Sequence, residues 1–397
     1  MINLLKNISL FLLVFSLIND NFLVASPAGA NSLKAIFAFF LIINVREIIQ
    51  GFLQPKNTTM KFFYLFFFSL AAIAFTDVIL GYVPLIQALF ILVGIFVVFV
   101  YVSYNQAFDK LLYFIWISMV FSAILAVFSD PITPWTFRKT GGTGDPNEFA
   151  TQLLATMAIT VYLFTKNKNI LFLLSSMTLF LYTLLYAGSK SSFLTLGVLI
   201  VFVLVAKFSD LLKKLFSFKT FLLILIIGIG LSFSNISQMK AVKGIQERAQ
   251  SAGTAKTRFV SWNAGVRMAE DNLFTGVGIE QYEKNVKRYA TDFIAKGSYA
   301  PHNFLIKILG EAGFFPLVTM ILFLIVLFGS EYRRIVHTDY FWIYIAALSV
   351  ILMGLTLSIA YEKYFWLFLG LLSHINLILF IEEKKEDLYY EDHAYST

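Results

Sequence analysis

His302 has a position in the sequence that suits a general base. It stands in Pro301–His302–Asn303, directly before an apolar run. A helix that starts there has partial positive charge at its N-terminus, which disfavours the imidazolium form and leaves a histidine neutral near pH 7. Such a histidine can accept a proton from a hydroxyl group. The alternative is an interfacial histidine whose nitrogens are satisfied by water or a lipid headgroup.

Arg258 lies one turn before Trp262 in Thr257–Glu270, a segment whose apolar residues recur at helical spacing. A guanidinium held at a partly dry interface stabilises negative charge that develops on a phosphate leaving group. The surrounding stretch 235–301 contains ten Lys/Arg, including Arg267, against six Asp/Glu. The sequence therefore predicts an anion site here, with a solvated basic surface as the alternative.

The run that follows His302 contains further polar residues. Asn303 is adjacent to the histidine, and Lys307 and Glu311 are four residues apart, close enough on a helix to pair. Ionisable residues at membrane depth usually face a polar cavity or a partner. Asn303 and Glu311 are therefore candidate binding residues, and mutual neutralisation of Lys307 and Glu311 is the alternative.

Two shorter segments combine cations with glycine or hydroxyl groups. In 138–148, Arg138 precedes a glycine-rich turn, and Asp145, Pro146 and Glu148 predict a helix start with an N-cap and a capping box. This turn could hold a phosphate or a sugar, although a glycine-rich turn alone is weak support. In Gly188–Ser192, Lys190 stands among three serines, and a snorkelling lysine is the alternative.

The composition identifies the elements that must position these residues. Of the 397 residues, 58% are hydrophobic and 14% are charged, and the mean hydropathy is +0.76. This excludes a water-soluble enzyme, and the absence of cysteine excludes disulfides. We expect an all-α, polytopic membrane protein forming a single domain over 1–397. About twelve spans are predicted, near 8–25, 32–45, 61–76, 84–103, 110–129, 148–165, 170–187, 190–206, 219–234, 302–328, 340–358 and 364–381.

The distribution of cations predicts the orientation. With a cytoplasmic N-terminus, the inner loops hold fifteen Lys/Arg and the short outer loops hold five. Both termini are then cytoplasmic, 235–301 becomes a long outer loop with a small helical layer, and 382–397 is a flexible cytoplasmic tail. Ala28–Gly29–Ala30 imitates a signal-peptidase site, but we favour an uncleaved first span.

Motifs of several other classes are missing from the sequence. It contains no HExxH, Walker loop or GxSxG pattern and no clustered metal ligands. We expect no metal, no cofactor and no nucleic-acid partner. Because the compartment on the outer side lacks ATP, a transferase there must use a donor that is already activated.

The order of these motifs resembles the O-antigen ligase and polymerase family. The resemblance rests on the segment 142–150 ahead of one span, Gly188–Ser192 at a later one, Thr257–Arg258–Phe259 with Trp262, Gly276–Val277–Gly278, and His302–Asn303 followed by 310–313. It is strongest over 138–320. It implies a metal-independent, GT-C-like glycosyltransferase of the bacterial cytoplasmic membrane, acting at the outer face on a glycan linked to undecaprenyl diphosphate.

The resemblance also implies roles for single residues. In the family, two arginines bind the diphosphate and a histidine activates the acceptor hydroxyl. Arg258 matches one of the arginines and His302 matches the histidine. Lys190 stands where the other arginine is usual. The leading hypothesis is an inverting polymerase that joins lipid-linked repeat units, favoured by the aromatic-rich spans and the Gly-x-Gly of the loop, with a chain-length regulator as a possible partner. Alternatives are a ligase that uses lipid A core as acceptor, a transporter or flippase for the lipid-linked glycan, and a scaffold.

Overall fold

The computed structural model describes residues 2–19, 29–53, 57–79, 107–130, 138–207, 253–290 and 300–394. Within these ranges the regular structure is helical and contains no strand. Six helices are long and apolar enough to cross a membrane: α5 (Thr58–Ile79), α7 (Phe108–Phe128), α8 (Pro146–Asn167), α9 (Ile170–Ala187), α17 (Phe314–Gly329) and α20 (Lys363–Ala394). The protein is therefore an all-α, multi-pass membrane protein.

Other predicted spans correspond to shorter helices or fall outside the described residues. Apolar helices of shorter length are α1 (Ile2–Ile18), α10 (Lys190–Ala206) and α19 (Phe341–Gly354). The helix α3 (Gly29–Ile43) overlaps the span predicted over 32–45. The spans predicted at 84–103 and 219–234 lie outside the described residues, so the count of twelve stays a prediction. The segment from Glu382 continues α20 as helix to Ala394, and its mobility also stays a prediction.

Helices α8, α19 and α20 form the interior of the bundle. α8 packs closely against α19, and α19 against α20. Small residues such as Ala155 and Ala158 are buried on α8, as is typical where membrane helices approach one another. The buried Thr160 hydroxyl donates to its own helix, to Thr156 O at 2.8 Å. The Thr160 hydroxyl is thereby satisfied within its own helix.

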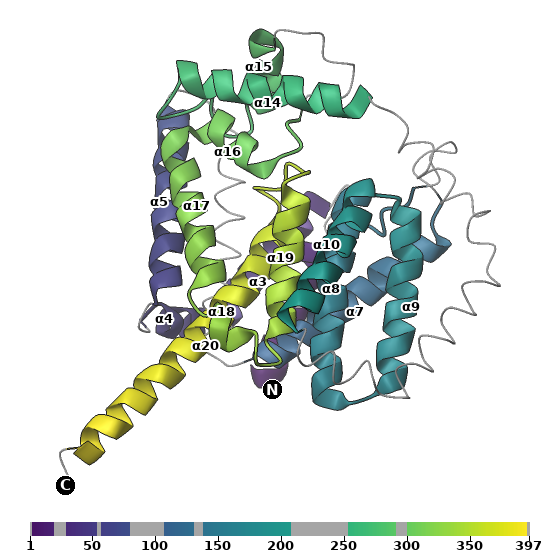
Figure 1. The fold of residues 1–397 in the computed structure, drawn as a ribbon, viewed down its shortest axis with the longest axis vertical. Coiled ribbons are helices and arrows are strands. Elements are labelled where there is room, and N and C mark those ends of the chain that lie inside the picture. Colours follow the sequence, from purple (N-terminus) through teal and green to yellow (C-terminus); the bar gives the residue numbers. More distant parts are fainter. Residues whose placement is uncertain are drawn as a thin grey trace.

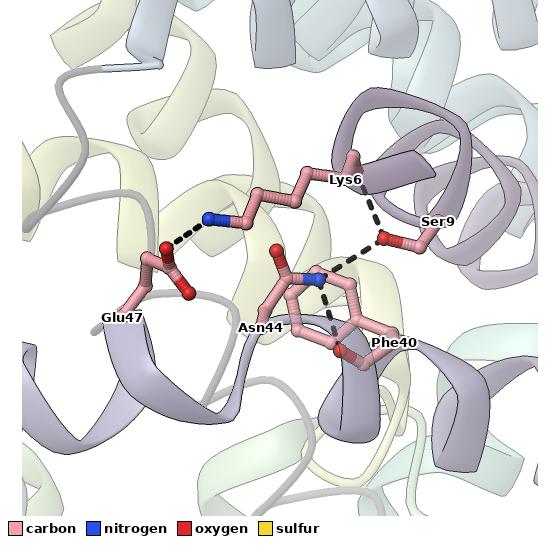
Figure 2. A network of polar contacts seen from close by, with 5 residues as sticks. All are labelled: Lys6, Ser9, Phe40, Asn44 and Glu47. Atoms are coloured by element: carbon pink, nitrogen blue, oxygen red, sulfur yellow. Dashed lines mark hydrogen bonds and ion pairs between the residues drawn. The ribbon is translucent and has the colours of Figure 1, made fainter. Parts of the chain in front are cut away.

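A polar network ties α1 to the short helix α4 (Val45–Leu53) (Figure 2). Lys6 pairs with Glu47, and Asn44 Nδ2 donates to Ser9 Oγ at 3.0 Å and to Phe40 O at 2.9 Å. Asn44 interrupts the helix between α3 and α4, and the Phe40 carbonyl accepts both from its backbone amide, at 3.1 Å, and from its side-chain amide.

A separate layer of helices lies across one end of the bundle (Figure 1). This layer, here called the upper layer, consists of α14 (Gly253–Asp271), α15 (Tyr282–Tyr289) and α16 (Phe304–Ala312). α14 contacts both other members. The helix predicted over 257–270 corresponds to α14, and α15 also lies in the segment 235–301, for which a small helical layer was predicted. Both ends of the described chain lie at the opposite end of the bundle (Figure 1).

The span predicted over 302–328 is wrong, because the chain breaks at Gly313 into α16 and α17. The carbonyl oxygens of Gly310 and Glu311 accept from the amides of Val277 and Gly278, at 2.9 and 3.0 Å, instead of continuing the helix. Gly313 has φ +85°, a conformation that glycine adopts without strain. Only α17 then belongs to a candidate span, which begins at Phe314, so α16 joins the upper layer.

Candidate active site

His302 sits in a short segment held against the connection between α19 and α20. Its amide donates to Ser358 Oγ at 2.9 Å, and its backbone has φ +49°, unusual for a residue with a Cβ. Asn303 caps α16 through Oδ1, which accepts from Leu305 N at 2.9 Å, and its Nδ2 donates to Leu355 O at 3.3 Å. The backbone before α16 is thus fixed on both sides of the histidine, and the side chain of Asn303 is engaged in positioning.

Helix α14 docks on the same segment. Trp262 Nε1 donates to Pro301 O at 2.6 Å, and Ser261 Oγ to Ala300 O at 3.3 Å. Arg258 lies three residues before Ser261 and four residues before Trp262, so it occupies the same face of α14 as these two side chains. Trp262 thus anchors α14 to the segment before α16, and this brings Arg258 close enough to His302 for its charge to act on the histidine.

The electrostatic surroundings of His302 keep it neutral. Its pKa is lowered from the ordinary value of 6.5, first by burial and then by the positive charge of Arg258. Asp145 and Glu283 act in the opposite direction. The sequence predicted a neutral histidine from the helix terminus, whereas the causes here are burial and a neighbouring cation. Two elements far apart in sequence, around 145 and 283, also bring carboxylates near the histidine.

Arg258 has an unused donor beside His302. Its Nε is buried and has no hydrogen-bond partner among the described residues. Burial lowers the pKa of its guanidinium from the ordinary value of 12.5, but arginine stays charged at neutral pH. A half-buried cation with an unsatisfied N–H favours an anion as its ligand.

The segment 138–145 and the end of α9 lie against each other. Arg138 donates to Ala187 O at 2.9 Å and to Asn147 Oδ1 at 2.7 Å, and the Lys139 amide donates to Tyr186 O at 3.1 Å. The predicted N-cap is confirmed, since Asp145 Oδ1 accepts from Asn147 N at 2.6 Å. Arg138 therefore joins the two segments.

Lys190 begins α10 and is exposed. It lies three residues after Ala187, the acceptor of Arg138. The structure thus places Arg138 and Lys190 in neighbouring segments, and Asp145 of the first segment acts on His302.

Two other predicted site residues lie elsewhere. Arg267 is nine residues after Arg258, which places it on the opposite face of α14, where it is exposed and donates to Tyr289 O at 3.4 Å. Glu311 is only 1% exposed, and its Oε1 accepts from Tyr282 N at 3.1 Å at the start of α15. The structure does not bring these two residues beside His302.

The ion pair between Lys307 and Glu311, which was the alternative to a binding role, is not formed between these two described residues. Lys307 Nζ lies 5.3 Å from the centre of the Tyr361 ring. Burial raises the pKa of Glu311 to about 7, with the charge of Lys307 opposing it. Glu311 instead satisfies an N-terminal amide of α15, a common role for a carboxylate at a helix start.

Sequence reasoning missed Tyr282, which joins the three helices of the upper layer. The side chain is fully buried, its hydroxyl donates to Ser261 O, and its ring lies against Gly265 and Gly310. A Cβ on either glycine would come within 3.1 Å of the ring. The sequence contains one of these glycines on each of two predicted helices, and such a pair can indicate that the two helices cross closely.

The described residues contain no group of three His, Cys, Asp or Glu side chains placed to hold a metal ion. Anion binding is favoured by Arg258, whose buried Nε has no partner among the described residues and whose charge acts on His302.

A comparison with protein families adds to this geometry. The family model described as O-Antigen ligase matches residues 175–321. These residues carry the O-antigen ligase domain. The domain includes Lys190, Arg258, His302, Asn303 and Glu311, so the resemblance stated from the sequence is confirmed. No curated protein matches the chain.

The domain match gives the general class of the protein. The O-antigen ligase domain covers the upper layer, α10 and parts of α9 and α17. The match supports a membrane enzyme of the general O-antigen ligase and polymerase type.

Proposed function

We propose that this protein is an inverting glycosyltransferase that polymerises undecaprenyl-diphosphate-linked repeat units at the outer face of the bacterial cytoplasmic membrane. The observation that carries the proposal is the pairing of a neutral His302 with Arg258, whose Nε is buried without a partner. Both termini are cytoplasmic in this proposal, and no metal takes part.

His302 accepts the proton of the acceptor hydroxyl as that oxygen bonds to the anomeric carbon of the donor sugar. The bond from this carbon to the diphosphate oxygen breaks, and both electrons leave with the lipid diphosphate. Attack from the side opposite the leaving group inverts the anomeric centre. Arg258 stabilises the negative charge that grows on the diphosphate.

Further residues are assigned to binding. Lys190 supplies a second cation for the diphosphate, and the Arg138 segment lines the sugar. Lysine retains the charge of arginine without its two parallel donors. Asn303 and Glu311 position the site: Asn303 caps the N-terminus of α16, and Glu311 accepts from an amide at the start of α15.

The test uses purified protein reconstituted in vesicles with lipid-linked repeat units as the sole glycan substrate. A polymerase forms a ladder of chain lengths without lipid A core, whereas transfer that depends on added core identifies the ligase. His302→Ala and Arg258→Ala are expected to abolish the ladder. Arg267→Ala and His337→Ala are matched controls: Arg267 faces the other side of α14, and His337 lies at the opposite end of α17.

Two results would contradict this assignment. Ladder formation retained in both site variants would remove His302 and Arg258 from the chemistry. Movement of lipid-linked repeats across the vesicle membrane by His302→Ala, without any transfer by the unmodified protein, would favour the transporter.

A further inference from the structure

The connection between α14 and α15 exposes apolar side chains beside the start of α17. Phe274 is 72% exposed and Leu273 47%, and Phe314 and Phe315 are each 52% exposed. Phe314 N donates to Leu273 O at 2.8 Å. The four residues, here called the apolar clasp, are therefore neighbours that belong to two different elements.

The clasp has a fixed backbone. Gly313 lies so close to the connection that a Cβ there would be 2.7 Å from Leu273 O. The Gly276 amide donates to Asn272 O at 2.8 Å, and Gly276 packs on the backbone of Glu311. Because both sides are held by the backbone, the exposure of the apolar side chains is a property of the fold.

The apolar clasp continues the exposed face of a membrane span. On α17 the exposed residues Phe314, Ile321 and Ile325 recur at helical spacing. The other side of α17 packs on α5, where Thr319 Oγ1 lies 3.1 Å from Ser69 Oγ. Since the span begins at Phe314, its exposed face meets lipid, and Leu273 and Phe274 extend that face beyond the end of the span.

We propose that the apolar clasp inserts into the phospholipid leaflet at this end of the bundle and anchors the upper layer to the membrane surface. Large apolar and aromatic side chains at the end of a span favour the boundary between headgroups and acyl chains. The exposed Glu270 and Asp271 directly before the clasp and Thr275 after it are placed where headgroups and water begin. The partner is the bilayer itself.

Anchoring at the clasp has a consequence for the rest of α14. Arg258 lies near the other end of this helix, which crosses the upper ends of α5 and α17 (Figure 1). A helix held at its C-terminal end by lipid and at its middle by the hydrogen bond from Trp262 to Pro301 keeps a constant height above the membrane. The anchoring itself does not depend on the proposed glycosyltransferase activity.

The absence of native cysteine permits a direct test with single-cysteine variants. Phe274→Cys, Ile325→Cys and Lys287→Cys of the full chain are labelled with a nitroxide in phosphatidylethanolamine and phosphatidylglycerol vesicles. Collision with oxygen, which concentrates in the bilayer, is compared with collision with a nickel complex, which stays in water. The label at 274 is expected to collide more with oxygen than with the nickel complex, as the label in Ile325→Cys does. The label in Lys287→Cys, at an exposed position of α15, is expected to collide more with the nickel complex.

Two outcomes of the labelling overturn the proposal. A nickel preference at 274 equal to that at 287 would place the clasp in water. Spin–spin broadening at 274, with nickel and oxygen both excluded, would show that a second copy of the chain covers it.

Hydrogen exchange provides a second measurement. Phe274→Asp in vesicles is expected to raise exchange of the α14 amides by about tenfold, because the insertion of one phenylalanine side chain is lost. Asp271→Asn, three residues away and exposed, is the matched control and should leave exchange unchanged. Equal hydrogen exchange of the α14 amides in Phe274→Asp and in the unmodified protein would contradict the proposal.

Discussion

At the scale of single residues, the site depends on two groups that modify each other. The positive charge of Arg258 favours neutral His302, and burial acts on both in the same sense. In the proposed mechanism, a neutral base and a phosphate-binding cation can therefore act together at neutral pH. Asp145 and Glu283 limit this effect by favouring the protonated histidine.

This coupling predicts a displaced pH profile. Since transfer needs neutral His302 and its pKa lies below 6.5, activity is expected to fall only at acidic pH. Removing the charge in Arg258→Gln should raise the pKa of His302, so the acidic limb of kcat/KM moves to higher pH while the maximum rate drops by about 100-fold or more. Initial rates of ladder formation from pH 5 to pH 8 check this, and an unmoved acidic limb would show that the two groups are independent.

Glu311 predicts a pH dependence of stability. Its pKa is raised by burial from 4.5 to about 7 in the fold, so the unfolded chain loses this proton first as the pH rises. The contribution of Glu311 is fully present below pH 4.5 and is lost as the pH rises to about 7. Glu311→Gln should remove this component. The unfolding midpoint of each protein in detergent is measured at pH 5 and at pH 8. The change between the two pH values should be larger for the unmodified protein than for Glu311→Gln. Equal changes in the two proteins would show that Glu311 titrates normally.

At the scale of elements, the break at Gly313 determines which helices serve the site. It separates α16 from the membrane span, and the free carbonyls at the end of α16 accept from the 276–278 turn. Tyr282 then fills the crossing of α14 and α16. The site is thus assembled by the packing of one short helix against two others.

The turn itself provides a test of this packing. A Cβ at Gly276 would lie 2.3 Å from the backbone carbon of Glu311, and the residue has φ +62°. Gly276→Ala is expected to destabilise the upper layer by about 1–3 kcal/mol. Hydrogen exchange of α14 and α15 reports this loss. Gly197→Ala on α10, where a Cβ has no neighbour within 4 Å, is the control and should cost nothing.

At the scale of the whole molecule, the upper layer and the two ends of the chain lie at opposite ends of the bundle (Figure 1). The distribution of cations assigns the ends to the cytoplasm. With cytoplasmic ends, as the distribution of cations predicts, the candidate site and the apolar clasp at the other end of α14 are expected on the outer side of the membrane.

This arrangement predicts the labelling of intact cells. Lys287→Cys, exposed on α15, should react with a membrane-impermeant maleimide in intact spheroplasts. His337→Cys, exposed in the connection between α17 and α19, should react only after permeabilisation. The unmodified chain has no cysteine and serves as the blank. Reaction of both variants from the same side would reject the orientation.

The sequence by itself determined the features that depend on local composition and spacing. Apolar runs predicted the helices α7, α8 and α9, and the Asp145–Pro146 pair predicted the start of α8, because spans and caps follow from neighbouring residues. The order of short motifs led to the O-antigen ligase domain, and the choice of Arg258 and His302 also came from it.

Only the tertiary structure decided how these pieces meet. The break at Gly313 follows from hydrogen bonds to a turn more than thirty residues earlier in the chain, which hydropathy does not register. Arg258 and Arg267 are equivalent as sequence, yet α14 directs one toward His302 and the other away. Contacts between distant segments carry no local signal, so the proximity of His302, Arg258 and Asp145 required the fold.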